Sequence, residues 1–469
     1  MKVLSVTSEC APLVKTGGLA DVAGALPGAL GPLVVDMRTL LPGYPAVLKA
    51  AKNAEAVTEY RDLMGGPATL RAAKVRDLDL LILDAPHLFD REGSIYLGPD
   101  GKDWPDNPER FAALSWVAAE IARDGAADWT PDVVHCHDWQ AALAPYYLRN
   151  SDIPTILTIH NIAFHGLAPA DRIGPLRLAP EDFDREGYEF WGQVSALKAG
   201  LVWATKLTTV SPTYAQELMR EEFGMGLDGV MRARRADLSG ILNGIDEQTW
   251  NPATDPLVTT YKAPRGKAKN KAELRRIMGL PESDGPLCVV ISRLTEQKGL
   301  DMLIDALPAL TERGGQLALL GSGSAYLEYA FHAAAGQPNV AVRIGYDEAL
   351  SHKMIAGGDA ILVPSRFEPC GLTQLYGLRY GTVPVVALTG GLADTVINAS
   401  PAALAKGVAT GIQFYPVTTD ALSGALSRLC DLWELPEIWT RLQKNGMSQP
   451  VDWKLSAEAY ASLYEVVKA

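Results

Sequence analysis

Cysteine is scarce in this sequence, and its spacing matches neither disulfides nor metal sites. The five cysteines are scattered, at positions 10, 136, 288, 370 and 430. Disulfide-stapled proteins carry an even set at short spacings, and zinc sites use paired Cys-x-x-Cys motifs. The sequence therefore argues against a disulfide framework and a paired metal motif, and we expect a reducing, cytoplasmic environment.

Long apolar runs and a positive net charge are also missing. No apolar stretch approaches the roughly 18 residues that span a bilayer. The first apolar run is followed by Glu9 and Lys15, which favours a buried strand over a secretory signal. A formal net charge of −12 argues against a nucleic-acid surface, which is normally basic. It does not exclude an anionic small substrate, because a few local cations can outweigh a distant negative total.

The chain does contain enough hydrophobic residues to form the cores of two or three globular domains. It has 469 residues, of which 48% are hydrophobic and 21% charged. Short apolar runs alternate with helix-length segments, which predicts parallel sheets covered by helices on both faces. The predicted strands are residues 3–6, 78–83, 133–135, 155–159, 206–210, 241–242, 287–292, 316–320, 340–344, 360–363 and 383–388. We expect a domain boundary near residues 240–265.

Local signals also place helices. Asn107, followed by proline, predicts an N-cap for a helix that ends at Gly125. Ser211, also followed by proline, predicts the same device for a second helix. Apolar residues recur at helical spacing through residues 452–467, which predicts one amphipathic helix that could pack back on the first domain.

The hexapeptide Thr-Gly-Gly-Leu-Ala-Asp occurs twice, at residues 16–21 and 389–394. Both copies follow an apolar strand-like run and precede a segment that can form a helix. A diglycine turn at a helix start is suited to holding an anion, because the first helical N–H groups point at it. Lys15 precedes the first copy and adds a point charge that suits a phosphate. A surface lysine on an ordinary turn explains that copy equally well.

Two further strand ends carry candidate chemistry. Arg293 and Lys298 follow a predicted strand, and ligands bind at such ends in doubly wound sheets, so the pair resembles a diphosphate clamp. Glu368 follows another strand in a Pro- and Gly-shaped loop, where it can hold sugar hydroxyls or balance developing positive charge. Solvated surface residues are the alternative for all three. Cys370 has no neighbouring histidine in the sequence, which disfavours a reactive thiol.

Histidines and an acidic residue end two more predicted strands. His135 and His137 point the same way on a strand, but no third ligand follows at a usual spacing, so a metal site is disfavoured. Asp138 more plausibly starts a helix and offers a polar group at its tip, and His160 ends the next strand. A glycine-rich segment that resembles a dinucleotide fingerprint has Tyr326 at its third glycine position, which weakens an oxidoreductase interpretation.

Taken together, these motifs closely resemble the bacterial glycogen synthases, a family that also includes the plant starch synthases. The resemblance spans essentially the whole chain, in the right order. It rests on Lys-Thr-Gly-Gly-Leu-Ala-Asp-Val at residues 15–22, His-Asp-Trp at 137–139, Thr-Ile-His-Asn at 158–161, Asn-Gly-Ile-Asp at 243–246, Ser-Arg-Leu-Thr-Glu-Gln-Lys-Gly at 292–299 and Pro-Ser-Arg-Phe-Glu-Pro-Cys-Gly-Leu-Thr-Gln at 364–374. His165 stands where that family often has glutamine, and the segment at residues 31–34 replaces the commoner helix end.

The resemblance implies the α/β fold called GT-B, with two Rossmann-like doubly wound parallel-sheet domains facing each other across a deep cleft. We expect an N-terminal acceptor-side domain at residues 1–242, a nucleotide-sugar domain at 243–450 and a C-terminal helix at 451–469. The implied reaction transfers glucose from ADP-glucose to the non-reducing-end 4-hydroxyl of an α-1,4-glucan, with retention of configuration. The resemblance implies no cofactor, and two or three fixed cations at the phosphates make a metal unnecessary.

The resemblance also implies roles for individual residues. Lys15 and the amide of Gly18 would meet the distal phosphate, with Arg293 and Lys298 neutralising the ADP leaving group. Tyr346 would stack on adenine. The donor loop would be Glu368, Cys370 and Gly371 at the glucose, with Leu372 and Thr373 at the phosphate. Around the sugar and the acceptor hydroxyl would lie Asp138, Trp139, His160, Asn161 and Asn243, with Asp21 and Tyr96 nearby.

Several alternatives stay open at this point. A double displacement would need a carboxylate on the face of the sugar opposite the leaving ADP, and the sequence does not place Asp138 there. Internal return, with the leaving phosphate and the incoming hydroxyl on the same face, is therefore the preferred explanation of retention. The rival enzyme interpretation is another retaining GT-B transferase, one that makes sucrose, trehalose or a glycolipid. A glucan-binding protein that has lost activity is disfavoured, because the four charged site residues are present. A glucan phosphorylase is disfavoured because no pyridoxal-phosphate lysine motif is seen.

Overall fold

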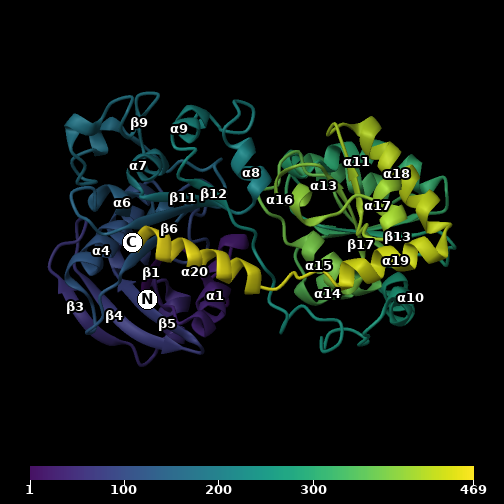
Figure 1. Ribbon diagram of the computed structural model, residues 1–469, viewed down its shortest axis with the longest axis horizontal. Coiled ribbons are helices and arrows are strands. Elements are labelled where there is room, and N and C mark those ends of the chain that lie inside the picture. The colour runs from purple at the N-terminus through teal and green to yellow at the C-terminus, as the bar shows by residue number, and fades with distance from the viewer. Residues whose placement is uncertain (469) are drawn as a thin grey trace. The chain divides into compact units, whose positions relative to one another are not determined.

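The computed structural model describes residues 1–468, and its chain divides into two compact units. Unit 1 comprises residues 1–242 together with the segment from Trp453, and unit 2 comprises residues 243–452 (Figure 1). Within residues 1–468 no helix has the length and apolarity needed to cross a bilayer.

Unit 1 is built on a large, mostly parallel sheet. Its strands are β1 (Lys2–Val6), β2 (Asp36–Pro42), β3 (Glu55–Tyr60), β4 (Ala68–Val75), β5 (Leu78–Asp84), β6 (Val133–His137), β7 (Thr155–Ile159), β11 (Lys206–Thr209) and β12 (Leu238–Gly240). They lie in the order β12-β11-β7-β6-β1-β2-β5-β4-β3, and only the pairs made by β4 are antiparallel. A small antiparallel sheet is formed by β8 (Leu167–Pro169), β10 (Gln193–Ser195) and β9 (Glu189–Phe190).

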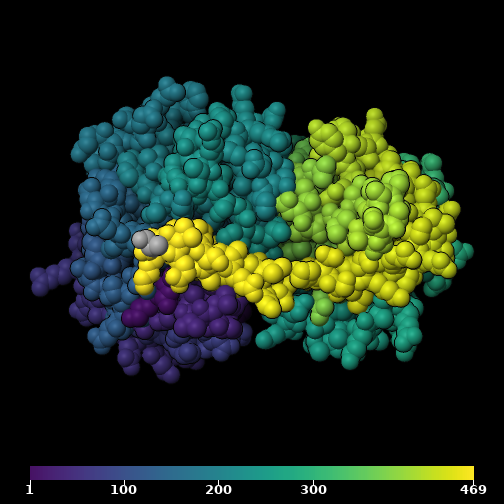
Figure 2. All heavy atoms as spheres, in the orientation of Figure 1, coloured from purple at the N-terminus to yellow at the C-terminus, as the bar shows by residue number. Residues whose placement is uncertain are grey.

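Helices cover the unit 1 sheet. They are α1 (Gly18–Leu30), α2 (Pro45–Ala50), α3 (Pro86–Phe89), α4 (Asn107–Asp124), α5 (Asp138–Ala141), α6 (Leu143–Tyr147), α7 (Ala196–Trp203), α8 (Pro212–Glu217), α9 (Asp228–Ala233) and α20 (Lys454–Lys468). The C-terminal helix α20 packs beside α1, and its side chains Ala457, Tyr460 and Tyr464 complete an apolar core under the sheet (Figure 1). One side of α20 remains open on the surface (Figure 2).

Unit 2 contains a six-stranded sheet in which every pair is parallel. Its strands are β13 (Leu287–Ile291), β14 (Gln316–Gly321), β15 (Val340–Ile344), β16 (Ala360–Val363), β17 (Val383–Ala387) and β18 (Ile412–Phe414). Their order, β15-β14-β13-β16-β17-β18, is the Rossmann order 3-2-1-4-5-6. Successive residues of β13 enter opposite cores: Val290 lies in one and Val289 in the other. The sheet is therefore covered on both faces, as the apolar runs predict.

The helices of unit 2 supply the two covering layers. They are α10 (Ala268–Met278), α11 (Leu300–Ala306), α12 (Pro308–Thr311), α13 (Ala325–Ala334), α14 (Glu348–Gly357), α15 (Thr373–Tyr380), α16 (Gly390–Thr395), α17 (Pro401–Lys406), α18 (Thr419–Trp433) and α19 (Pro436–Met447). Leu303 of α11 and Leu426 of α18 enter one core, whereas Met354 of α14 and Leu375 of α15 enter the other.

Two local predictions are wrong. Residues 241–242 are not a strand, because β12 ends at Gly240, although the amide of Ile241 still bonds to Thr209 of β11. Asn107 is not an N-cap: it is the first residue of α4, and its side chain bonds instead to the carbonyl of Tyr96 and to Arg110. The Ser211 cap is confirmed, since its hydroxyl accepts from the amide of Tyr214 at 3.1 Å.

Candidate active site

In unit 1 the predicted site residues follow strands at the point where the sheet changes direction. β1 has β2 on one side and β6 on the other. At such a point the connections that follow two neighbouring strands run in opposite directions. They leave a crevice at the carboxyl ends of the strands, and ligands bind there in α/β sheets. The residues that follow these ends are Lys15 and Gly18 after β1, Asp138 and Trp139 after β6, and His160 and Asn161 after β7.

A buried carboxylate holds the first glycine loop in place. Glu9 accepts hydrogen bonds from the amides of Thr16 (2.6 Å) and Gly17 (3.2 Å) and from the Thr16 hydroxyl (2.7 Å). Helix α1 then starts at Gly18. The backbone N–H groups of its first turn have no hydrogen-bond partner within the helix. Sequence reasoning missed Glu9. The signal for it was a carboxylate shortly after a buried strand and just before a diglycine.

Lys15, Asp21 and Tyr96 lie around the same loop. Lys15 donates to Asp21 at 2.7 Å, and both side chains are substantially exposed. An exposed pair of this kind contributes little and exchanges readily, so Lys15 can turn to a phosphate. The Tyr96 hydroxyl bonds to Glu9 at 2.8 Å and to Ser8 at 2.7 Å, and burial raises the pKa of Tyr96 well above its ordinary value.

Asp138 ties together the ends of β6 and β7. One of its carboxylate oxygens accepts from the amide of His160 at 2.7 Å and from that of Asn161 at 3.3 Å. Burial raises the pKa of Asp138 to about 7. The residue also has a φ of +55°, a left-handed conformation that is uncommon outside glycine and that Asp adopts more readily than most residues. Asp138 therefore orients the strand end that carries His160.

Three buried histidines lie close together at these strand ends, and two of them, His137 and His160, are hydrogen-bonded to each other. His137 Nδ1 lies 3.0 Å from His160 Nε2, and its other nitrogen lies 3.2 Å from the Ser5 hydroxyl. His135 bonds to Tyr464 of α20 at 2.8 Å. Burial lowers the pKa of all three rings, that of His137 to about 3, so they are neutral near pH 7. Within residues 1–468 no group of three or more metal-ligating side chains converges on one point.

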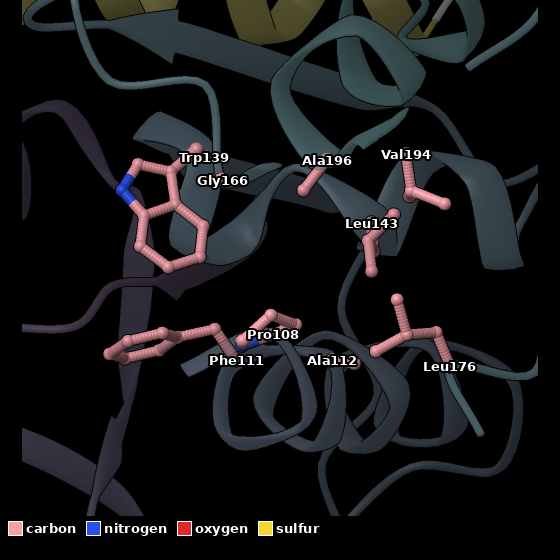
Figure 3. A pocket seen from close by; sticks show the side chains of 9 residues that line it. All are labelled: Pro108, Phe111, Ala112, Trp139, Leu143, Gly166, Leu176, Val194 and Ala196. Atoms are coloured by element: carbon pink, nitrogen blue, oxygen red, sulfur yellow. The ribbon is translucent and has the colours of Figure 1, made fainter. Parts of the chain in front are cut away.

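Trp139 closes an apolar wall on the other side of the site. Its ring packs edge-on against Phe111, with centroids 5.0 Å apart, and presses on Gly166 so closely that a Cβ there would lie 2.2 Å from the indole. Figure 3 shows Trp139 and Phe111 at one end of a small cavity and Val194 and Leu176 at the other. The indole is thus fixed in orientation by its packing.

In unit 2 the predicted residues also follow the strands at which the sheet order reverses. β13 and β16 are neighbours at the point where the sheet grows in opposite directions. Arg293 and Lys298 follow β13, and the loop from Glu368 to Thr373 follows β16. Lys298 Nζ lies 2.5 Å from Glu368 Oε2, and both side chains are largely buried. The Ser365 hydroxyl donates to the same oxygen at 2.8 Å. The structure therefore brings together a cation and a carboxylate that are 70 residues apart.

The second hexapeptide copy supports the Glu368 loop. The amide of Gly391 donates to the carbonyls of Glu368 and Pro369, each at 3.1 Å. A Cβ on Gly390 would lie 1.9 Å from the Glu368 carbonyl oxygen, so only glycine permits this approach. This copy shapes the loop through its backbone.

Two further side chains hold the same loop and were not predicted. Arg366 makes two hydrogen bonds to the carboxylate of Asp301, at 2.7 and 2.6 Å. The Gln374 amide donates to the carbonyls of Cys370 (3.0 Å) and Gly371 (2.9 Å). Both lie inside the motif at residues 364–374, whose dense polar composition was the available signal.

Cys370 and Asn243 lie side by side under the loop. Burial raises the pKa of the Cys370 thiol to about 12, whereas the nearby backbone amide of Asn243 lowers it. The thiol is therefore neutral and unreactive near pH 7. The Asn243 side-chain oxygen is buried and has no hydrogen-bond partner among the described residues. Such an acceptor points to a ligand.

The remaining predicted residues lie at the rim of unit 2. Gly371 has a φ of +73°, which lets the chain turn into α15, and Leu372 and Thr373 stand at the start of that helix. Arg293 is exposed after β13. The ring of Tyr346 is 79% exposed, and its hydroxyl bonds to Glu348. An exposed ring suits stacking on a base.

Family comparisons define the class of the protein. Residues 2–233 match the family model described as the starch synthase catalytic domain, and residues 271–446 match the model described as glycosyl transferases group 1. These matches and the two parallel-sheet α/β folds define a glycosyltransferase of the GT-B class.

Relatives along the full chain narrow this class to one family. The chain is 63% identical to the glycogen synthase of Paracoccus denitrificans, with 100% of both chains covered. It is 53% identical to glycogen synthase 1 of Rhizobium meliloti, again over 100% of each. The chain belongs to the glycogen synthase family.

Solved structures agree. The catalytic domain of starch synthase IV from Arabidopsis thaliana, bound to ADP and acarbose, matches with a TM-score of 0.88 and 31% identity over 99% of each chain. Sucrose-phosphate synthase from Thermosynechococcus elongatus matches with a TM-score of 0.59 at 18% identity, over 99% of this chain and 98% of the other, and shows the fold alone.

Proposed function

We propose that the chain elongates glycogen by transferring glucose from ADP-glucose to the non-reducing-end 4-hydroxyl of an α-1,4-glucan, with retention of configuration. The contact between Lys298 and Glu368 at the order reversal of the unit 2 sheet carries this proposal. A cation and a carboxylate side by side suit a reaction that separates a negative diphosphate from a cation-like sugar.

In the proposed mechanism unit 2 holds the donor. Arg293 and Lys298 neutralise the charge that develops on the leaving diphosphate, and Tyr346 stacks on the adenine. Glu368, Cys370 and Gly371 hold the glucose, and the helix start at Leu372 and Thr373 directs amides at a phosphate. The starch synthase IV relative is bound to ADP, which supports adenosine diphosphate as the leaving group.

Unit 1 supplies the acceptor side and one further phosphate contact. Lys15 and the amide of Gly18 meet the distal phosphate, next to Asp21 and Tyr96. The acceptor sugar is held by Trp139, His160 and Asn161, together with Asn243 of unit 2. The hydrogen bond from each fixed donor strengthens as negative charge develops on the leaving diphosphate. This lowers the barrier to transfer without a metal.

Retention proceeds by internal return in this proposal. Asp138 supports it: one carboxylate oxygen accepts two backbone amides, and burial favours its protonated form, with a pKa of about 7. A carboxyl whose ionisation is disfavoured by burial, and one of whose oxygens is held by two backbone amides, is a weaker nucleophile for a double displacement than a free carboxylate. The incoming hydroxyl can instead lose its proton to the departing phosphate on the same face. A covalent glucosyl adduct on Asp138 or Glu368, trapped and seen by mass spectrometry, would contradict this route.

The test measures diphosphate release from two donors. The purified chain is incubated with ADP-glucose or UDP-glucose, with and without glycogen, and the released nucleoside diphosphate is measured while NMR follows the new anomeric linkage. We expect ADP release that requires glycogen and forms α-linkages. Faster release from UDP-glucose would overturn the assignment of the donor, and release without glycogen would overturn that of the acceptor. Glycogen binding with no release from either donor would indicate a binding protein.

A further inference from the structure

A tryptophan occupies an unfavourable turn at the tip of the β9–β10 hairpin. Phe190 pairs with Gln193, so the loop has only two residues, Trp191 and Gly192, with φ values of +50° and +79°. Two-residue turns with positive φ at both positions strongly prefer Asn-Gly or Gly-Gly, because a bulky side chain is strained there. The Trp191 ring is also 84% exposed, so burial does not offset the strain. Strained residues that persist in this way cluster at ligand contacts.

The outward face of the small sheet continues this aromatic surface. Cross-strand partners share a face, so Phe190 and Gln193 lie on the same side as Pro169, and Leu167 lies two residues along that strand. Val194 and Ala168, on the opposite face, are buried. Phe164, just before this sheet, is 58% exposed.

A continuous series of packed groups joins this face to the candidate site. Trp139 presses on Gly166, and the neighbouring His165 packs against Phe190 with centroids 4.7 Å apart. The backbone of Phe164 bonds to that of Asn161, a predicted acceptor residue, at 3.4 Å. Gly226 packs closely against Phe190, since a Cβ on Gly226 would lie 3.1 Å from the Phe190 ring. The aromatic rings of this face are therefore connected through packed groups to Trp139 and Asn161, the predicted acceptor contacts that follow β6 and β7.

We propose that Phe164, Phe190, Trp191 and Gln193 form a second glucan subsite, called here the hairpin surface. It binds sugar residues of the acceptor chain beyond the one that reacts. An acceptor polymer must continue from the reacting end over the surface of unit 1. Sugar rings present C–H faces that pack on exposed aromatic rings, and their hydroxyls bond to an amide such as that of Gln193. The proposal rests on the function proposed above, because it takes Asn161 and Trp139 as acceptor contacts.

Occupation of several subsites along one polymer raises its affinity without any change at the reacting sugar. The hairpin surface therefore affects long glucans and leaves the donor untouched. His165 packs against Phe190 of this surface.

The test replaces Trp191 by the residue that the turn prefers. Trp191→Asn removes the ring and relieves the positive-φ strain, so the melting temperature should stay the same or rise. Affinity electrophoresis in gels that contain glycogen, without any nucleotide sugar, should show binding weakened about 10-fold, the scale of one aromatic contact. The KM for glycogen should rise by a similar factor while the KM for ADP-glucose stays the same. Tyr329→Ala, which removes a ring 77% exposed on unit 2, is the matched control.

The outcomes separate this proposal from the function. Unchanged glycogen affinity in Trp191→Asn would overturn the hairpin surface even if the chain transfers glucose normally. A change from dimer to monomer in sedimentation, with glycogen affinity intact, would assign the surface to a second copy of the chain and would also overturn the proposal. Weakened glycogen binding would support the subsite even if the transfer assay with both donors were negative, because the gel contains no donor.

Discussion

At the scale of single residues, the candidate site depends on the charge and the protonation state of a few buried side chains. Glu368 and Lys298 each neutralise the other in a largely buried setting. Removing one partner leaves an uncompensated charge, which costs more than the pair itself contributes. Both side chains also follow strands at which the sheet order reverses, which is where ligands bind in α/β sheets.

We expect Glu368→Ala and Lys298→Ala each to lower kcat by on the order of 100-fold or more, because each removes a fixed charge that stabilises charge separation. Initial-rate ADP release measures the effect, and far-ultraviolet circular dichroism checks the fold. Glu312→Ala, which removes an exposed carboxylate from the end of a unit 2 helix, serves as the control and should retain wild-type turnover. Near wild-type turnover in both site variants would refute the assigned site.

The buried histidines give unit 1 a defined pH response. Burial lowers the pKa of His137 from its ordinary 6.5 to about 3, so folding favours the neutral ring. That stabilisation is complete above pH 6.5 and is lost as the pH falls toward 3, because the unfolded chain then binds the additional proton.

We expect His137→Asn to flatten the pH dependence of stability. Between pH 7.5 and 5.0 its unfolding free energy should fall less than that of the wild type, by on the order of 1–2 kcal/mol, since one proton contributes about 1.4 kcal/mol per pH unit. Urea titrations at the two pH values measure the difference. His332→Asn, at an exposed histidine in unit 2, should keep the wild-type dependence. Equal slopes for His137→Asn and the wild type would show that His137 does not stay neutral in the folded chain.

At the scale of elements, one hexapeptide does two different things. In the first copy α1 starts at the second glycine and runs for 13 residues, and the preceding amides bond to Glu9. In the second copy the six-residue α16 starts at the first glycine, and its amide at Gly391 holds the Glu368 loop. The surroundings decide the outcome: a buried carboxylate follows β1, whereas the loop after β16 presents carbonyl groups to α16.

The two copies offer a matched pair of substitutions. Gly390→Ala places a Cβ 1.9 Å from the Glu368 carbonyl oxygen at a φ of +43°, whereas Gly17→Ala meets nothing within 4 Å at a φ of −157°. We expect Gly390→Ala to destabilise the chain by about 2 kcal/mol or more, through backbone strain and the clash, and Gly17→Ala to change stability by less than about 0.5 kcal/mol. Thermal melts compare the two, and equal melting temperatures would contradict the close approach at Gly390.

At the scale of the whole molecule, the end of the chain completes the core of unit 1. Helix α20 follows unit 2 in the sequence, yet Tyr460 and Tyr464 are fully buried against the unit 1 sheet. The Tyr464 hydroxyl bonds to His135, so the last helix also touches the histidines under the candidate site.

Tyr460→Ala should therefore destabilise unit 1 selectively. Truncating a fully buried aromatic side chain costs about 3–5 kcal/mol. Hydrogen exchange followed by mass spectrometry should show faster exchange in β6 and α1 and unchanged exchange in β14 and β17. Leu455→Ala, at an exposed position of the same helix, is the control. Faster exchange in the strands of unit 2 as well would show that α20 stabilises both units.

Sequence reasoning succeeded where the information is local. Largely apolar runs predicted β1, β7 and the central strands of unit 2, because strands buried on both faces consist mostly of apolar residues. It failed where a side-chain contact outside the local pattern, or partial exposure of a strand, decides. Asn107 bonds to Tyr96 and Arg110 instead of capping α4, and the half-exposed β3 and β4 carry no apolar run.

The sequence by itself determined the alternation of strands and helices, and the motifs by which the chain resembles its family. The tertiary structure alone decided which of these motifs meet. Sheet order places the ends of β13 and β16 side by side and so joins Lys298 to Glu368. It also decided that Glu9 holds one diglycine loop while Gly391 holds the Glu368 loop, since a hydrogen bond depends on which group lies opposite in space. Propensity and spacing act along the chain, whereas the groups that bind a ligand are selected by packing across it.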